Sequence, residues 1–147
     1  MFAALVVLLG LVASLPWIAY AVALAQIDGR PTPPAIQRLS PEQIESLHLS
    51  LRKAGPLTVP ELSPWEYVFD LVWNPERLSS GGVAAAWVVA KDFNLKHLKR
   101  RRSTWWHFSG AALVVWLTRN WSSDQVLARA FEIEHERGAE SNHLDFP

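Results

Sequence analysis

The densest cluster of charged residues lies at positions 91–102, directly after an apolar run, and its composition indicates anion binding. Cationic side chains bind phosphate through charge-assisted hydrogen bonds. The cluster therefore predicts a site for anionic phosphate, either of bilayer headgroups or of the pyrophosphate in a lipid-linked sugar. A solvated helix face or a juxtamembrane anchor is the alternative interpretation of the same charges. The cations assigned to this site are Lys91, Lys96, Lys99, Arg100, Arg101 and Arg102.

A single carboxylate, Asp92, lies inside this cluster and is the candidate for acid–base chemistry. Activating a sugar hydroxyl requires a general base, and a carboxylate can serve as one. Glu66 or Glu76 would be its carboxylate partner in such a reaction. The alternative interpretation is that Asp92 forms an ion pair with a neighbouring Lys or Arg.

Other kinds of chemistry lack the residues that they need. The chain has no cysteine, which excludes disulfides and thiol catalysis. His97 and His107 are ten residues apart with no cysteine nearby, so we predict hydrogen-bonded or interfacial roles for them rather than a metal site. Fourteen basic residues balance fourteen acidic ones, so the overall charge does not favour nucleic acid. We therefore expect no metal, no cofactor and no nucleic-acid partner.

The N-terminal segment is long and apolar enough to anchor these residues to a membrane. Phe2 to Ala25 carry no charged side chain, and at about 1.5 Å per helical residue their length matches a hydrocarbon core of roughly 30 Å. Residues 1–26 are therefore predicted to form a retained, single-pass transmembrane helix. The alternative is a cleaved signal peptide, because residues 23–25 have the small-x-small form of a signal-peptidase site.

A small all-α domain is predicted after this anchor. Residues 27–39 are rich in proline and are predicted to form a stiff tether. The helical domain covers residues 40–138, and residues 139–147 are predicted to form a flexible tail. Within the domain, Ser40 and Ser63 each precede a proline, which is typical of a capped helix start. The helix after Ser63 is predicted to present Trp65, Val68, Phe69 and Val72.

Two apolar segments are predicted to form the buried centre of the domain. Residues 83–90 are apolar on all sides, which is typical of a buried helix, and residues 79–82 before them are predicted to form a flexible joint. Residues 104–117 are predicted to be the central buried helix, with an in-plane membrane segment as the alternative. A last helix is predicted to begin at Ser122 and to end at Gly138.

Residues 109–120 resemble the second motif of the peptidoglycan glycosyltransferases, the lysozyme-like domain of bifunctional penicillin-binding proteins. That motif reads Gly-Gly-Ser-Thr-Ile-Thr-Gln-Gln-Leu-x-Lys-Asn. The positions matched in register without a gap are Gly110, Leu113, Leu117, Arg119 and Asn120. Residues 87–97 are similar to the first motif of the family, an apolar run followed by Glu-Asp-x-x-Phe-x-x-His. The resemblance implies a truncated, lysozyme-like α fold and a site for peptidoglycan or a lipid-linked precursor, to which Arg119 and Asn120 would contribute.

The departures from these motifs fall on catalytic positions. Lys91 stands where the family has its catalytic Glu, and a lysine ammonium cannot take up the proton that a general base must accept. We therefore expect a non-catalytic, transglycosylase-like assembly protein of the bacterial cell envelope. It would sit in the inner membrane with a periplasmic domain, and it would bind membrane lipid and a protein partner.

Two other functions and a second orientation stay open at the level of sequence. One alternative is a minimal membrane-bound glycosyltransferase or lytic enzyme acting on a glycan. The other is a membrane adaptor that binds anionic lipid and a protein partner through surface charge alone. Arg30 and Arg38 follow the span, and a count of positive charges would place the domain on the cytoplasmic side.

Overall fold

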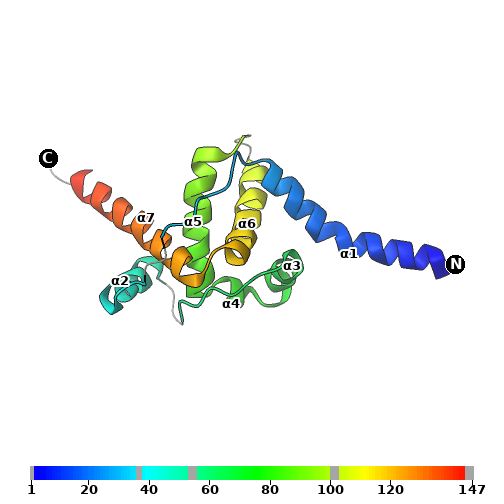
Figure 1. The fold of residues 1–147 in the computed structure, drawn as a ribbon, viewed down its shortest axis with the longest axis horizontal. Coiled ribbons are helices and arrows are strands. Elements are labelled where there is room, and N and C mark those ends of the chain that lie inside the picture. The colour runs from blue at the N-terminus through cyan, green and yellow to red at the C-terminus, as the bar shows by residue number, and fades with distance from the viewer. Residues whose placement is uncertain (1, 36–37, 53–55, 100–102, 145–147) are drawn as a thin grey trace.

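The computed structural model describes residues 2–35, 38–52, 56–99 and 103–144. In this part of the chain it has seven α-helices and no β-strand, which confirms the predicted mainly α-helical fold. The helices are α1 (Phe2–Ala25), α2 (Pro41–Leu51), α3 (Pro64–Trp73), α4 (Pro75–Leu78), α5 (Gly81–His97), α6 (Ser103–Asn120) and α7 (Ser123–Leu144). The N-terminal half of α1 projects from one side of the helical body, and the C-terminal end of α7 projects from the other side (Figure 1).

The two predicted Ser-Pro starts are capping boxes. The Ser40 backbone N–H donates to the side chain of Gln43, whose own N–H donates back to the Ser40 hydroxyl. Ser63 and Glu66 exchange the same pair of hydrogen bonds at the start of α3. The bond from the Ser63 N–H is the main reason why the pKa of Glu66 is lowered. Both helices therefore begin where local sequence alone predicted them.

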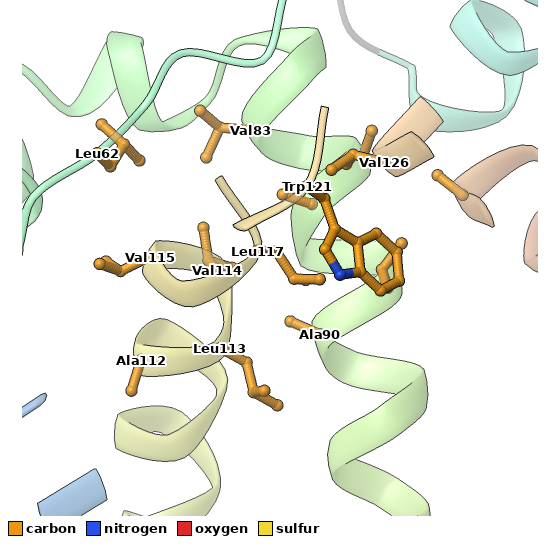
Figure 2. Packing of buried hydrophobic residues seen from close by; sticks show 14 of the residues in the cluster. Leu62, Val83, Ala90, Ala112, Leu113, Val114, Val115, Leu117, Trp121 and Val126 are labelled. Carbon is orange, nitrogen blue, oxygen red and sulfur yellow. The ribbon is translucent and has the colours of Figure 1, made fainter. Parts of the chain in front are cut away.

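The core forms where α5 packs between α6 and α7. Val83, Leu113 and Leu117 are fully buried in it, and Figure 2 shows these side chains meeting Val126 of α7 and Trp121. The residues predicted as buried helices, 83–90 and 104–117, thus lie in the two central helices. Residues 109–117 are buried or half-buried, which confirms this part of the predicted central helix. Phe108, in the first half of the same segment, is 57% exposed.

The last turn of α1 is part of this core. Ala23, Leu24 and Ile27 are almost fully buried in the main hydrophobic cluster. Backbone hydrogen bonds from Asp28 N to His97 O (2.9 Å) and from Lys99 N to Gln26 O (3.0 Å) fasten the end of α1 to the end of α5. The apolar helix and the body therefore fold as one unit rather than as two parts joined by a spacer.

The beginning of the segment predicted as a tether also lies on the body. Pro31 is buried, and the Gln125 side chain donates a hydrogen bond of 3.2 Å to the Pro34 carbonyl. Proline has no backbone N–H group, so the prolines of this segment have no donor that would need a partner. The Pro34 carbonyl is still available and accepts the hydrogen bond from α7. Residues 27–34 hence run along α5 and α7, and positions 36–37 of the predicted tether lie outside the described residues.

Two other expectations about local structure are wrong. Residues 79–82 do not form a joint, because Gly81 and Gly82 begin α5 and are buried. A Cβ atom on Gly82 would overlap the Thr58 carbonyl, so glycine here allows close backbone packing rather than flexibility. The tail predicted from residue 139 is helical as far as Leu144, and Gly138 lies inside α7 instead of ending it.

Helix α3 turns the apolar face predicted from its sequence away from the body. Its two acidic residues, Glu66 and Asp70, face Arg77, and Arg77 Nη1 lies 2.9 Å from the buried Asp70 carboxylate. This ion pair holds the polar side of α3 against α4. The residues left at the surface are Trp65, Val68, Phe69, Leu71, Val72 and Trp73.

Candidate functional site

The charged end of α5 lines a small polar cavity that also borders α7 and residues 31–34. Its volume is about 350 Å³. The ionisable side chains in its wall are Asp92, Lys96, His97, Arg129 and Glu132. Trp121 lines the same cavity, and its buried indole N–H has no acceptor among the described residues. This is the cavity that contains the predicted acid–base candidate.

The functional groups of α5 are paired with one another in this cavity. Lys96 Nζ lies 3.0 Å from Asp92 Oδ2, and the His97 imidazole stacks on the Phe93 ring with centroids 4.0 Å apart. Both pairs arise because residues four apart share one face of a helix. The Asp92 side chain is only 19% exposed. The interpretation of Asp92 as an ion-pair partner is therefore confirmed.

A second ion pair between side chains leaves the wall of this cavity without a net charge from its Asp, Glu, Lys and Arg residues. Arg129 Nη1 lies 2.8 Å from Glu132 Oε2 on α7. The walls thus carry two carboxylates and two cations, each cation already matched by a neighbour. A cavity of this kind offers no excess positive charge to an anionic ligand.

The carboxylate pair proposed for catalysis is not brought together by any described contact. Glu66 caps α3 and lies 3.8 Å from Arg77, while Glu76 belongs to the short helix α4. Neither residue lines the cavity of Asp92. The carboxylate that does share this cavity is Glu132, which sequence reasoning missed because it lies 40 positions away on another helix.

The predicted phosphate-binding cations on α5 and directly after it lie in different surroundings. Lys91 lines a separate cavity of about 450 Å³ between α2, α4, α5 and α7. Lys99 Nζ lies 3.3 Å from Asp28 and donates a hydrogen bond of 3.2 Å to the Ala25 carbonyl. A cation at this place stabilises the negative C-terminal end of α1. Arg100, Arg101 and Arg102 lie outside the described residues.

The two polar residues matched to the glycosyltransferase motif lie at the far end of α6. Arg119 Nη1 lies 3.3 Å from Glu61 Oε1, and its guanidinium group lies 5.7 Å from the centre of the Trp17 ring. The Asn120 side chain donates to the Trp116 carbonyl. Arg119 hence connects α6 with α1, and no described contact joins it to the basic end of α5.

A third cavity, an almost entirely apolar groove, lies between α1, α3 and α6. Its volume is about 430 Å³. Pro16 and Ala23 belong to its α1 wall, Val68 and Leu71 to its α3 wall, and Ala111 to its α6 wall. No Asp, Glu, Lys or Arg side chain lines it, and its polar side chains are His107, Tyr20 and Tyr67. Sequence reasoning missed this groove, although the unusually apolar α3 was a signal for it.

The few polar groups of this groove are held by the body. Tyr67 lines the groove and is hydrogen-bonded to the Trp87 side chain. Burial raises the pKa of Tyr67 to about 12, so its hydroxyl stays neutral at physiological pH. His107 lies in this groove whereas His97 lies in the polar cavity. Among the described residues, no three His, Asp or Glu side chains gather as a metal site.

Gly110, which is matched to the family motif, and Ser109 before it have a packing role beside this groove. The buried Ser109 hydroxyl donates a hydrogen bond of 3.0 Å to Asn94 Oδ1, and the Asn94 amide donates to the Trp106 carbonyl. A Cβ atom on Gly110 would lie 2.8 Å from the Trp87 ring. Ser109 and Gly110 thus allow α5 and α6 to approach closely.

Comparison with known proteins finds no matching family model, no similar curated protein and no similar solved structure.

Proposed function

We propose that this chain is a membrane-anchored, non-catalytic assembly protein of the bacterial cell envelope, with α1 retained as a single span. The observation that carries this proposal is the burial of the end of α1 in the core of the body. A signal peptide leaves the mature protein, so its residues cannot contribute to the mature core. Here Ala23 and Leu24, which precede the predicted cleavage point, pack with the central helices.

The rest of α1 has the properties of a membrane span. Residues 4–25 form one continuous apolar helix, long enough to cross a bilayer and also compatible with a signal sequence. Large apolar side chains such as Leu5, Leu8 and Leu15 are more than half exposed. Burying these surfaces in hydrocarbon stabilises the protein by about 25 cal/mol for each Å² removed from water.

The polar cavity supports the non-catalytic part of the proposal. Asp92 is neutralised by Lys96 at 3.0 Å, and Lys91 occupies the position where the resembled family has its catalytic Glu. The setting, at the periplasmic face of the inner membrane, rests on the resemblance to peptidoglycan glycosyltransferases. The C-terminal end of α7 projects from the body on the side opposite the N-terminal half of α1 (Figure 1). It is therefore the element placed to reach a protein partner in an envelope complex.

We expect the full-length protein to stay in the membrane pellet after carbonate extraction and to have the intact mass of residues 1–147. The reason is that α1 is both apolar and part of the folded core. Fractionation of cells followed by mass spectrometry checks both points. A soluble product whose first residue is Gln26 would contradict the proposal and identify residues 1–25 as a signal peptide.

We expect neither the wild-type protein nor Asp92→Asn to polymerise a lipid-linked glycan substrate above background. The substitution removes an i,i+4 ion pair, which should cost only about 0.3–0.5 kcal/mol of stability. A polymerisation assay on both proteins checks this. Asp28→Asn, which removes the carboxylate beside Lys99, is the matched control. Polymer formed by the wild type and by Asp28→Asn, but lost in Asp92→Asn, would establish the enzyme alternative instead.

A further inference from the structure

The length of α1 that stands free of the body is too short to cross a bilayer by itself. The Trp65 indole N–H of α3 donates a hydrogen bond of 2.8 Å to the Ala13 carbonyl of α1. Residues 2–13 measure about 18 Å at 1.5 Å per residue, whereas the hydrocarbon core is roughly 30 Å thick. With α1 spanning, about 12 Å of that thickness must be crossed where α1 lies against α3 and α6.

The exposed surface of α3 is apolar enough to lie within the hydrocarbon core of the bilayer. Phe69 is 55% exposed and Trp73 is 69% exposed, and the rings of these two residues stack with centroids 5.0 Å apart. The acidic residues of α3 face Arg77 on the other side. Soluble proteins seldom expose contiguous apolar patches larger than a few hundred Å². The apolar face of α3 therefore continues the hydrocarbon-facing surface of α1.

The apolar groove lies at the same level, because α1 and α3 form two of its walls. Its α1 wall runs from Pro16 to Ala23, which is the part of α1 that follows the contact with Trp65. Its volume of about 430 Å³ is within the roughly 300–1,000 Å³ typical of small-molecule sites. A groove without charged walls binds water poorly, so hydrocarbon from the surrounding bilayer is the occupant that its chemistry fits.

Cations mark the end of the groove where a lipid headgroup would lie. Ala23 lines the groove, and the carbonyl of the next residue, Leu24, accepts a hydrogen bond from Arg30. Lys99 reaches the Ala25 carbonyl at the same end of α1 and also pairs with Asp28 at 3.3 Å, so Arg30 and Lys99 together outnumber this carboxylate by one charge. Basic side chains that follow the end of a span are attracted to phosphate at the membrane surface.

We propose that the groove between α1, α3 and α6 binds an acyl chain of a bilayer phospholipid, with α3 immersed beside it and the phosphate toward Arg30 and Lys99. This inference rests on the proposed function, because it requires α1 to span the membrane. The inference adds a specific lipid-binding site to the anchored body. A domain that is only tethered to a membrane helix would have no such site. The lipid would act as a structural ligand that completes the packing between the three helices.

The experiment places the full-length protein in vesicles of phosphatidylethanolamine and phosphatidylglycerol that contain a phospholipid with a photoreactive acyl chain. After irradiation, labelled peptides are identified by mass spectrometry. We expect labels on α1, on α3 and on the groove wall around Ala111 of α6. The exposed surfaces of α2 and α7 should stay unlabelled, because the proposal places them outside the bilayer.

A matched pair of variants tests the groove itself. Ala111→Phe places a ring in the groove and should reduce labelling of the α6 wall by about tenfold, equivalent to about 1.4 kcal/mol of lost binding. Ala139→Phe makes the same change on the exposed surface of α7 and should leave the labelling unchanged. Leu71→Gln is a second variant at an exposed position of the groove. It should lower the labelling even if Ala111→Phe does not fold.

The possible failures can be told apart. Labels confined to the free half of α1 would overturn the lipid site but leave the membrane anchor intact. Equal labelling of the α6 wall in wild type, Ala111→Phe and Leu71→Gln would also overturn the lipid site. Absence of label from α1 itself, together with release of the protein by carbonate, would overturn the proposed function as well.

Discussion

Replacing Gly82 with alanine should destabilise the body by at least about 3 kcal/mol, the upper end of the usual cost of overpacking a core. A Cβ atom at this position would overlap the Thr58 carbonyl and lie 2.8 Å from the Val59 nitrogen. These are backbone atoms, so the clash cannot be relieved by a change of side-chain rotamer. Relief would require the 57–59 segment to move away from α5, which would uncover Leu57 and Leu62. Thermal or denaturant unfolding of the full chain in detergent measures the effect.

Gly138→Ala is the matched control for this substitution. Gly138 lies inside α7, and a Cβ atom there would meet nothing within 4 Å. Alanine has a higher helix propensity than glycine, so this change should stabilise the protein by up to about 1 kcal/mol. If Gly82→Ala unfolds at the same temperature as the wild type, the close contact between α5 and Thr58 is not present in solution.

Removing residues 1–25 should destabilise the body by more than the roughly 2–5 kcal/mol that a single buried Leu→Ala change costs. The deletion removes Leu24 and Ala23 from the core, and it also removes Tyr20, which packs against that core. The uncovered part of α6, including Ala112 and Val115, would face water. Expression yield and thermal unfolding of a chain that begins at Gln26 check this expectation.

A shorter deletion separates loss of the anchor from loss of the core. Removing residues 1–12 takes away exposed apolar side chains but leaves Ala13, whose carbonyl accepts the Trp65 hydrogen bond. Carbonate should release this variant from membranes, because no complete span remains, while the body keeps its unfolding temperature. A chain beginning at Gln26 that unfolds at the wild-type temperature would show that α1 is dispensable for folding. The signal-peptide interpretation would then be favoured.

The starts of α2 and α3, and the burial of the two central helices, could be predicted from the sequence. Each capping box is formed by residues three positions apart, Ser40 with Gln43 and Ser63 with Glu66, so it requires no information about the rest of the fold. The apolar run at residues 83–90 can be stable only where other side chains cover it. The pairing of Asp92 with Lys96 is also local, because four residues make about one helical turn.

The partners of the remaining charges were decided by tertiary structure. Arg119 pairs with Glu61, and Lys99 pairs with Asp28. In both pairs the residues are more than 50 positions apart in the sequence, and only the packing of the helices brings them together. The predicted phosphate cluster assumed that cations close in sequence would act together, yet helix geometry directs Lys91 and Lys96 into different cavities.

The surroundings of the apolar segments also depended on tertiary structure. Apolar side chains at helical spacing predict that one face of α3 is shielded from water. The pattern does not say whether other side chains of the protein or lipid chains of a bilayer cover that face. The Asp70–Arg77 ion pair turns the polar side of α3 inward and leaves Phe69 and Trp73 at the surface. The two glycines at the start of α5 were equally ambiguous, since glycine serves both flexible joints and close packing. The position of Thr58, more than 20 residues away, decides between these roles for Gly82.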